Sequence, residues 1–157
     1  MLSREEIARR IPHQGRMCLL ERVVDWSADS IHCEAQSHRA ADNPLRAYGR
    51  LGIACGVEYA AQAMAVHGAL IAQAAGPAGG APAQGYLASV RNVSLHARRL
   101  DDVAGDLTIR AQRLMGDAHN IVYGFSVQAG EVPLLGGRAT VVLDASIGSL
   151  IRPREPQ

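Results

Sequence analysis

Lysine is absent from this chain of 157 residues, and all 16 of its basic residues are arginine. Without lysine the chain has no Schiff-base chemistry and no lysine-dependent phosphate loop. Aromatic residues are also scarce, with one Phe and one Trp, so no base-stacking platform for single-stranded nucleic acid is available. Fifteen acidic residues nearly balance the arginines, and the net charge of +1 gives no reason to expect a nucleic-acid partner.

Metal-binding and disulfide patterns are missing as well. The three cysteines, Cys18, Cys33 and Cys55, are odd in number and widely spaced, and they form no CxxC pair. This pattern supports neither a disulfide framework nor a structural zinc site. No two histidines stand at HxH or HxxxH spacing, so we expect no metal and no cofactor.

Long hydrophobic runs are limited to residues 53–75, which are rich in alanine and contain Glu58, Gln62 and His67. Charged groups at that depth are costly in lipid, so the run predicts a buried helix with no membrane partner. His67 lies on the face of this helix opposite Glu58, and we expect it to be a core or interface histidine. The charged N-terminus lacks the apolar segment of a secretion signal, which predicts a cytoplasmic protein.

The remaining patterns predict an α+β domain over residues 1–150 with a disordered tail at 151–157. Ser3 is the expected N-cap of a short helix that ends at Pro12. A loop at 39–51 precedes the long helix at 52–74, and a Gly/Pro/Ala connector follows at 76–85. Strands are predicted at 17–26, 31–38, 86–98, 105–115, 120–129 and 134–144, the last four as an antiparallel meander. A curved sheet around one apolar helix would bury that helix on most sides.

Three stretches in this order are similar to bacterial 3-hydroxyacyl-acyl-carrier-protein dehydratases. The segment IPHQGRMCLLERV at 11–23 resembles their opening "LPH…LLxDRV", and HRAADNP at 38–44 resembles their "H…NP" loop. GVEYAAQAMA at 56–65 resembles the Glu-to-Gln face of their central helix. The resemblance covers residues 3–144 and implies the hotdog fold. It is strongest for the divergent branch found with aryl-polyene, polyketide or fatty-acid genes, and the family's "PGxPxMPG" element is largely missing.

The resemblance implies dehydration of 3-hydroxyacyl thioesters on acyl carrier protein to trans-2-enoyl thioesters, with an active site shared between protomers. An isolated curved sheet leaves free edges, so we expect a homodimer whose sheets join edge to edge. A higher oligomer or a heterodimer with another hotdog protein remains open. Two other functions also remain open: a hotdog thioesterase in which Glu58 activates water, and a non-catalytic hotdog partner subunit.

Glu58 is the candidate acid. Burial in so apolar a helix would favour its protonated form, which suits protonation of a leaving hydroxyl. Gln62, one helical turn later on the same face, is expected to orient it. The alternative is a structural Glu58 that bonds to a neighbouring strand or is exposed at the helix end.

Two histidines are candidates for the base that removes the proton next to the thioester carbonyl. His38 matches the family's catalytic histidine in position, at the end of the second predicted strand, although it stands several residues further from Glu58 than is usual. His13 lies in the segment that borders the substrate tunnel in the resembling family. The alternatives are an exposed loop histidine for His38 and a histidine that bonds backbone groups at a helix end for His13.

The start of the long helix is the candidate oxyanion site. Backbone N–H groups near Gly52 and Ile53 would polarise a thioester carbonyl, whereas glycines there would also serve close packing. Arg39, Arg46 and Arg50 crowd the preceding loop. Such a basic mouth would suit an acidic carrier protein, and a solvated loop is the alternative.

Overall fold

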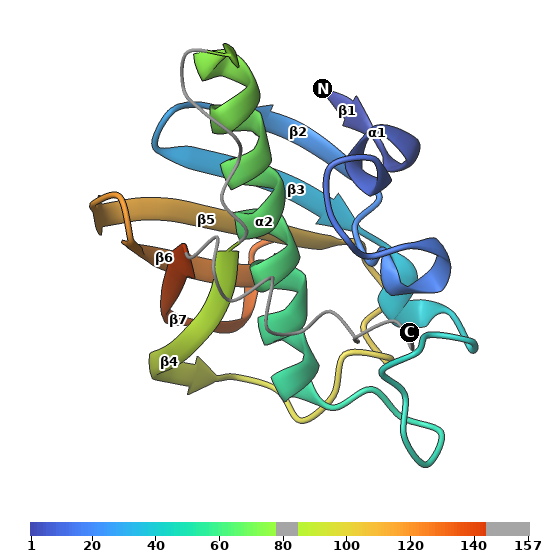
Figure 1. Cartoon of the computed structure of the whole chain (residues 1–157). Coiled ribbons are helices and arrows are strands. Elements are labelled where there is room, and N and C mark those ends of the chain that lie inside the picture. The colour runs from blue at the N-terminus through green and yellow to red at the C-terminus, as the bar shows by residue number, and fades with distance from the viewer. Residues whose placement is uncertain (78–84, 144–157) are drawn as a thin grey trace, which may run out of the picture.

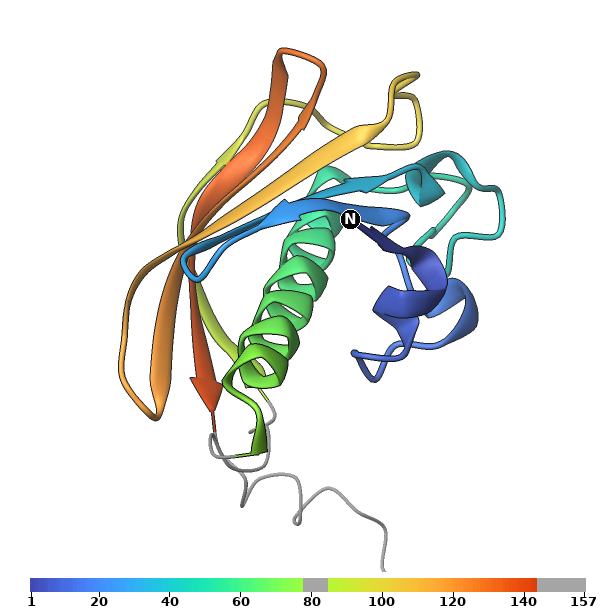
Figure 2. The same cartoon turned by 90° about the horizontal axis from the view of Figure 1, so that it is seen from above.

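A long helix, α2 (Gly56–Ala75), lies in the concave face of a curved antiparallel sheet of seven strands (Figures 1 and 2). The computed structural model describes residues 1–77 and 85–143. The strands are β1 (Leu2–Ser3), β2 (Arg22–Trp26), β3 (Ser30–Ala35), β4 (Gly85–Leu95), β5 (Leu107–Gly116), β6 (Asn120–Ala129) and β7 (Val132–Leu143). A short helix, α1 (Arg4–Ala8), and three 3₁₀ turns, η1 (Gly15–Met17), η2 (Ser37–Arg39) and η3 (Ile53–Cys55), are the other elements of these residues. The predicted α+β hotdog architecture is confirmed.

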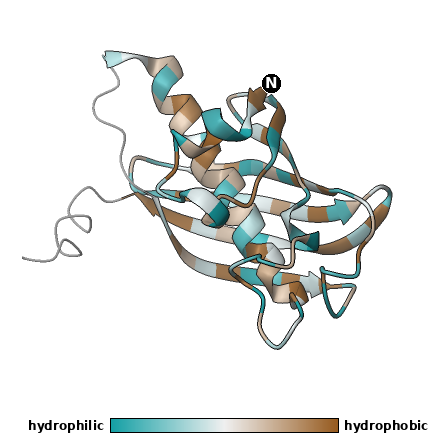
Figure 3. Cartoon of the chain, turned by 90° about the vertical axis from the view of Figure 1, so that its right-hand side faces the viewer, coloured by the Kyte–Doolittle hydropathy of each residue, from teal (hydrophilic) through white to brown (hydrophobic). Residues whose placement is uncertain are grey.

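The core lies between α2 and the inner face of the sheet. Side chains alternate along the strands between buried apolar and more exposed polar positions, as Figure 3 shows by hydropathy. The helix meets this face with tightly packed residues such as Tyr59, Ala63 and Val66, which are fully buried. Gly56 sets the closest approach, because a Cβ there would collide with the Leu135 side chain of β7. Small residues therefore allow the helix to lie directly on the sheet.

The sheet order corrects the predicted four-strand meander. Strands follow the order β1-β2-β3-β5-β6-β7-β4, so only β5, β6 and β7 form a meander. β4 pairs with β7 at the edge, and β3 pairs with β5. The reason is the crossover: α2 carries the chain across the concave face, so β4 begins at the far edge and the later strands fill the space between.

Several element boundaries also differ from the prediction. The strand expected at 17–26 is limited to Arg22–Trp26, because the backbone before it bonds to a side chain of α2 instead of a strand. The strand expected at 31–38 ends at Ala35, where η2 follows. The long helix begins with the 3₁₀ turn Ile53–Cys55. Most of the connector expected at 76–85, the domain end at 150 and the tail at 151–157 lie outside the described residues.

His67 is a core histidine, as expected. Its Nε2–H donates to the Ser27 carbonyl at 2.8 Å, so its Nδ1 accepts from the Tyr123 hydroxyl, also at 2.8 Å. Burial lowers the pKa of His67 below its ordinary value of 6.5, because the charged ring would lose water without gaining a carboxylate partner. The neutral ring therefore connects α2, β6 and the β2–β3 turn.

Acid should destabilise this fold through His67. The unfolded chain binds a proton at the ordinary value, so from about pH 7 down through about 6.5 the unfolded state takes up more protons than the folded state. We expect the free energy of unfolding, measured by urea denaturation, to fall over this range. His67→Gln keeps an amide that bonds without titrating, and it should flatten the fall. Replacing the exposed His96 by Gln is the matched control and should leave the slope unchanged; equal slopes in all three proteins would contradict the assignment.

Candidate active site

His13 and Glu58 meet at one end of a pocket. Glu58 lies in the first turn of α2, and His13 lies in the segment between α1 and η1. His13 Nε2 is 3.2 Å from Glu58 Oε1, and the two side chains are 27% and 36% exposed. Glu58 is thus less buried than the apolar helix suggested, because it faces this pocket and not the packed core. His13 Nδ1 is buried without a hydrogen-bond partner in the described residues, so the ring keeps one nitrogen that the protein does not use.

Gln62 brings these two segments together. Its fully buried side chain accepts from the Leu19 amide at 2.9 Å and donates to the Met17 carbonyl at 2.8 Å. Its contact with Glu58 Oε1 is longer, at 3.4 Å. The Gln62 amide therefore holds the η1 segment against α2 first and contacts Glu58 second, which changes the role expected for it.

The pocket is an apolar cavity of about 490 Å³ between α2, β4, β6 and β7. Its polar groups, Arg10, His13 and Glu58, belong to α2 and to the segment around α1. The α2 wall carries small side chains, and the sheet wall carries larger apolar ones such as Leu87 and Val141. A cavity of this size and lining suits an apolar ligand with one reactive polar group near the acid–imidazole pair.

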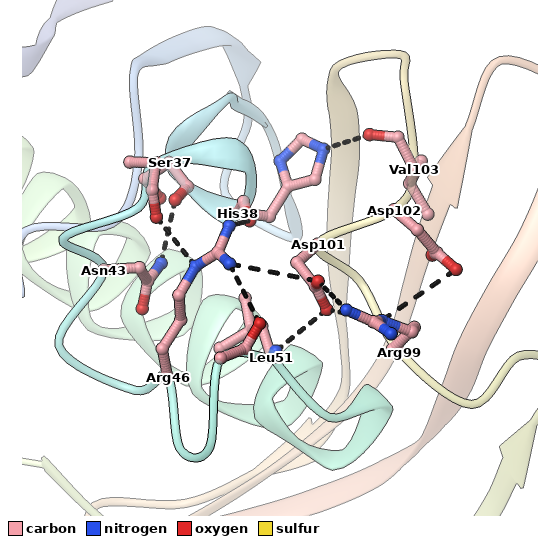
Figure 4. A network of polar contacts seen from close by, with 11 residues as sticks. Ser37, His38, Asn43, Arg46, Leu51, Arg99, Asp101, Asp102 and Val103 are labelled. Carbon is pink, nitrogen blue, oxygen red and sulfur yellow. Dashed lines mark hydrogen bonds and ion pairs between the residues drawn. The ribbon is translucent and has the colours of Figure 1, made fainter.

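His38 is not part of this pocket, which corrects the expectation that it ends a strand at the active site. It lies fully buried in η2, where its Nε2 is 3.1 Å from the Val103 carbonyl and 3.0 Å from that of Gly105. Figure 4 shows the ring turned toward Val103. Burial lowers the pKa of His38, the effect outweighing its two carbonyl contacts. Two backbone carbonyls therefore hold Nε2 of this ring in the protein interior, while its Nδ1 is buried without a hydrogen-bond partner among the described residues.

The loop around His38 is built on Asp101, which the sequence did not single out. Asp101 accepts from the Leu51 amide at 2.8 Å and forms ion pairs with Arg99 and Arg46 (Figure 4). The Arg99 guanidinium holds the pKa of Asp101 well below its usual range. Arg46 also donates to the Ala40 carbonyl, so it joins the two ends of the loop segment 40–46 as well as pairing with Asp101.

Two of the three arginines expected to form a basic entrance are engaged in ion pairs of this kind. Arg39 pairs with Asp106 at 2.6 Å, and Arg46 belongs to the Asp101 network. Arg50 alone of the three has no ion pair in the described part of the chain. Arg39 and Arg46 therefore stabilise the loop, which corrects the picture of three free charges around an entrance.

The helix start differs from the expected oxyanion site at Ile53. The Ile53 amide donates to the Arg98 carbonyl at 3.1 Å and is not free for a ligand. Gly52 lies opposite Arg99 in an isolated bridge just before η3. No group of three or more His, Cys, Asp or Glu in residues 1–77 and 85–143 is placed to hold a metal ion. None of the helices among these residues is long and apolar enough to cross a membrane.

A comparison with known protein families agrees with the observed fold. The model of the ApeP-like family, described as ApeP dehydratase, matches residues 5–151. The chain belongs to the ApeP-like dehydratase family. It is therefore a hotdog-fold dehydratase, an enzyme that removes water from its substrate. No curated protein sequence matches this ApeP-like dehydratase significantly.

Solved structures share the fold at low sequence identity. The dehydratase heterocomplex ApeI:P from Xenorhabdus doucetiae matches with a TM-score of 0.77 and 21% identity, covering 93% of this chain and 97% of that chain. A hypothetical thioesterase with coenzyme A from Streptococcus pneumoniae TIGR4 matches at 0.56 and 11%, covering 78% and 84%. Zebra fish thioesterase superfamily member 2 matches at 0.58 and 14%, covering 92% and 100%. At these identities the likeness shows the hotdog fold alone.

His38→Ala should lower the stability of this ApeP-like dehydratase. The variant leaves the Val103 and Gly105 carbonyls without their donor, at a cost of about 1–3 kcal/mol in the free energy of unfolding. Urea denaturation measures this cost. His119→Ala, which removes an exposed histidine, is the control and should change the free energy by less than about 0.5 kcal/mol. A His38→Ala variant as stable as the wild type would contradict the structural role.

Proposed function

We propose that this chain converts 3-hydroxyacyl thioesters on an acyl carrier protein to trans-2-enoyl thioesters. The observation that carries the proposal is the His13–Glu58 pair, with its 3.2 Å contact, at the end of an apolar cavity. Dehydration needs one group that takes a proton and one that gives a proton, and an acid–imidazole pair supplies both. The apolar cavity suits the acyl chain, and membership of the dehydratase family supports the reaction class.

In the proposed mechanism, neutral His13 removes the proton from the carbon next to the thioester carbonyl. Glu58 protonates the hydroxyl on the next carbon, the C–O bond breaks, a C=C bond forms and water leaves. The electron pair of the broken C–H bond becomes the second bond of the alkene. His13 takes this role in preference to His38, because both carbonyl contacts of His38 lie away from the pocket.

The negative charge that develops on the thioester oxygen needs a donor. We propose the N-terminal end of α2, where the partial positive charge of a 20-residue helix is concentrated in the turn that contains Glu58. Gly52 remains the candidate amide, since the Ile53 amide already donates to a carbonyl. A backbone donor there would need no side chain, metal or cofactor.

A second hotdog subunit is the proposed partner, paired along β4. This strand is the long free edge of the sheet, with 11 residues, whereas the edge strand β1 has two. Leu87, Val93 and Leu95 of β4 are exposed, and such an edge invites pairing with another strand. The ApeI:P structure is a heterocomplex, and it supports a hotdog partner for this chain.

Glu58→Gln should abolish most dehydration and leave the fold intact. The variant keeps the shape and polarity of the side chain but removes its transferable proton, so kcat should fall by roughly 10²–10⁴-fold. His13→Gln should lose activity to a similar degree, and the double variant should lose little more, because the two groups act in one step. The assay follows loss of water from 3-hydroxyacyl carrier protein by mass spectrometry, with circular dichroism as the folding control.

The products separate this proposal from its competitors. A free acid would identify a thioesterase, and no change in the substrate, with the partner subunit present, would identify a non-catalytic subunit. His38→Asn is the informative comparison, because this variant should have a lower free energy of unfolding and an unchanged kcat. Wild-type kcat in both Glu58→Gln and His13→Gln would exclude the proposed acid–base pair.

The proposed β4 pairing predicts a dimer. At micromolar concentration, light scattering should give about twice the 16.7 kDa mass of the chain. Leu95→Arg places a charge on the proposed edge, where Leu95 is 51% exposed, and it should shift the mass toward the monomer. Val132→Arg, at a 62% exposed position outside β4, is the control and should not. A wild-type monomer would contradict the homodimer and point to a different hotdog chain as the partner.

A further inference from the structure

Gly68 is a glycine without a structural reason in the middle of α2. Its φ is not in the left-handed region, and a Cβ built on it meets nothing within 4 Å. It differs in this from Gly56, whose Cβ would strike Leu135. Glycine in a helix interior costs stability relative to alanine, so neither backbone geometry nor packing accounts for glycine at position 68.

The pocket explains why glycine is found at position 68. Gly68 lines the cavity together with Glu58, Ala61 and Ala65, which follow one another at intervals of three or four residues on one face of α2. Gly68 lies ten residues beyond Glu58, or roughly 15 Å along the helix axis. A side chain at position 68 would therefore enter the cavity far from the acid–imidazole pair.

The opposite wall fixes what this part of the cavity accepts. It consists mostly of apolar side chains from β4, β6 and β7, among them Leu87, Ile121 and Leu143, together with the ring of Tyr86. Tyr123 also lines it, and its hydroxyl is already bonded to His67. The polar end at His13 and Glu58 and the apolar remainder match a thioester whose reacting carbons lie at one end and whose chain extends along α2.

We infer that Gly68 is a specificity-determining residue, which keeps the distal cavity open for the end of a long apolar acyl chain. The inference rests on the proposed function, since it places the reacting carbons at Glu58. Ala65 and Gly68 are exposed in the isolated chain, so this stretch of α2 is open to receive an acyl chain. The substrate class is accordingly a thioester with an extended apolar acyl chain and not a short one.

Binding of S-alkyl pantetheines, which are stable thioether analogues, tests this without requiring turnover. Calorimetry on the protein in its solution assembly would compare a series from butyl to tetradecyl. For the wild type, affinity should rise by about fourfold per added methylene until the chain reaches the cavity wall. In Gly68→Leu the affinity should stop rising at a chain several carbons shorter, and the longest chains should bind roughly tenfold or more weakly than they bind to the wild type.

Two further variants make the result decisive. Gly68→Ala should raise the midpoint of thermal unfolding and still weaken the longest chains, which separates loss of cavity from loss of fold. Ala74→Leu, an exposed alanine of α2 outside the cavity lining, should leave the whole series unchanged.

The inference is overturned if chain-length dependence is the same in the wild type and Gly68→Leu, or if no alkyl chain binds because another part of the assembly fills the cavity. Dehydration assayed in parallel distinguishes the two proposals. If Gly68→Leu shifts the chain-length limit but the wild type shows no dehydration, the proposed function is refuted and the role of Gly68 stands. If the wild type dehydrates its substrate but Gly68→Leu leaves the limit unchanged, the proposed function stands and the role of Gly68 is refuted.

Discussion

The buried amide of Gln62 is the interaction on which the active site depends. The backbone at Met17 and Leu19 forms no strand, so its buried polar groups need other partners, and the Gln62 side chain supplies both a donor and an acceptor. This pair of bonds holds the segment that contains His13 against α2, next to Glu58. Since Gln62 follows Glu58 by one helical turn, the same helix face carries the proposed acid and holds the segment of the proposed base, His13.

A second network holds the entrance to α2. Asp101, between β4 and β5 in the chain, bonds the Leu51 amide and pairs with Arg99 and Arg46 (Figure 4). His38 and Arg39 tie η2 to the carbonyls at 103–105. The loop at 39–51 is therefore attached to the β4–β5 connection by charge-assisted bonds that are stronger than ordinary loop contacts. The position of η3, and with it the helix start proposed as the oxyanion site, depends on this attachment.

The three histidines discussed here show how one residue type takes different roles in one fold. His67 and His38 are buried with their Nε2–H groups bound to carbonyls, and burial lowers the pKa of each ring. His13 is partly exposed, faces a carboxylate and keeps one ring nitrogen without a protein partner. His38 Nδ1 is likewise buried without a partner among the described residues, so what distinguishes His13 is its partial exposure and its contact with Glu58. The resemblance in motif order left both His38 and His13 as candidates for the base, and the carbonyl contacts of His38 are the reason why the proposed function uses His13.

Periodicity and composition by themselves determined the helix–sheet architecture, because an alanine-rich helix that is apolar on most sides has to be enclosed by a sheet. They also determined that Glu58 and Gln62 share a face of α2, since that relation depends only on the helical repeat. The place of β4 beside β7, the pairing of His13 with Glu58 and the Asp101 network were decided by tertiary structure alone. Each depends on contacts between residues far apart in the chain, such as 13 and 58 or 51 and 101. Local sequence patterns carry no information about such contacts, because the path of the chain between the two residues decides whether they meet.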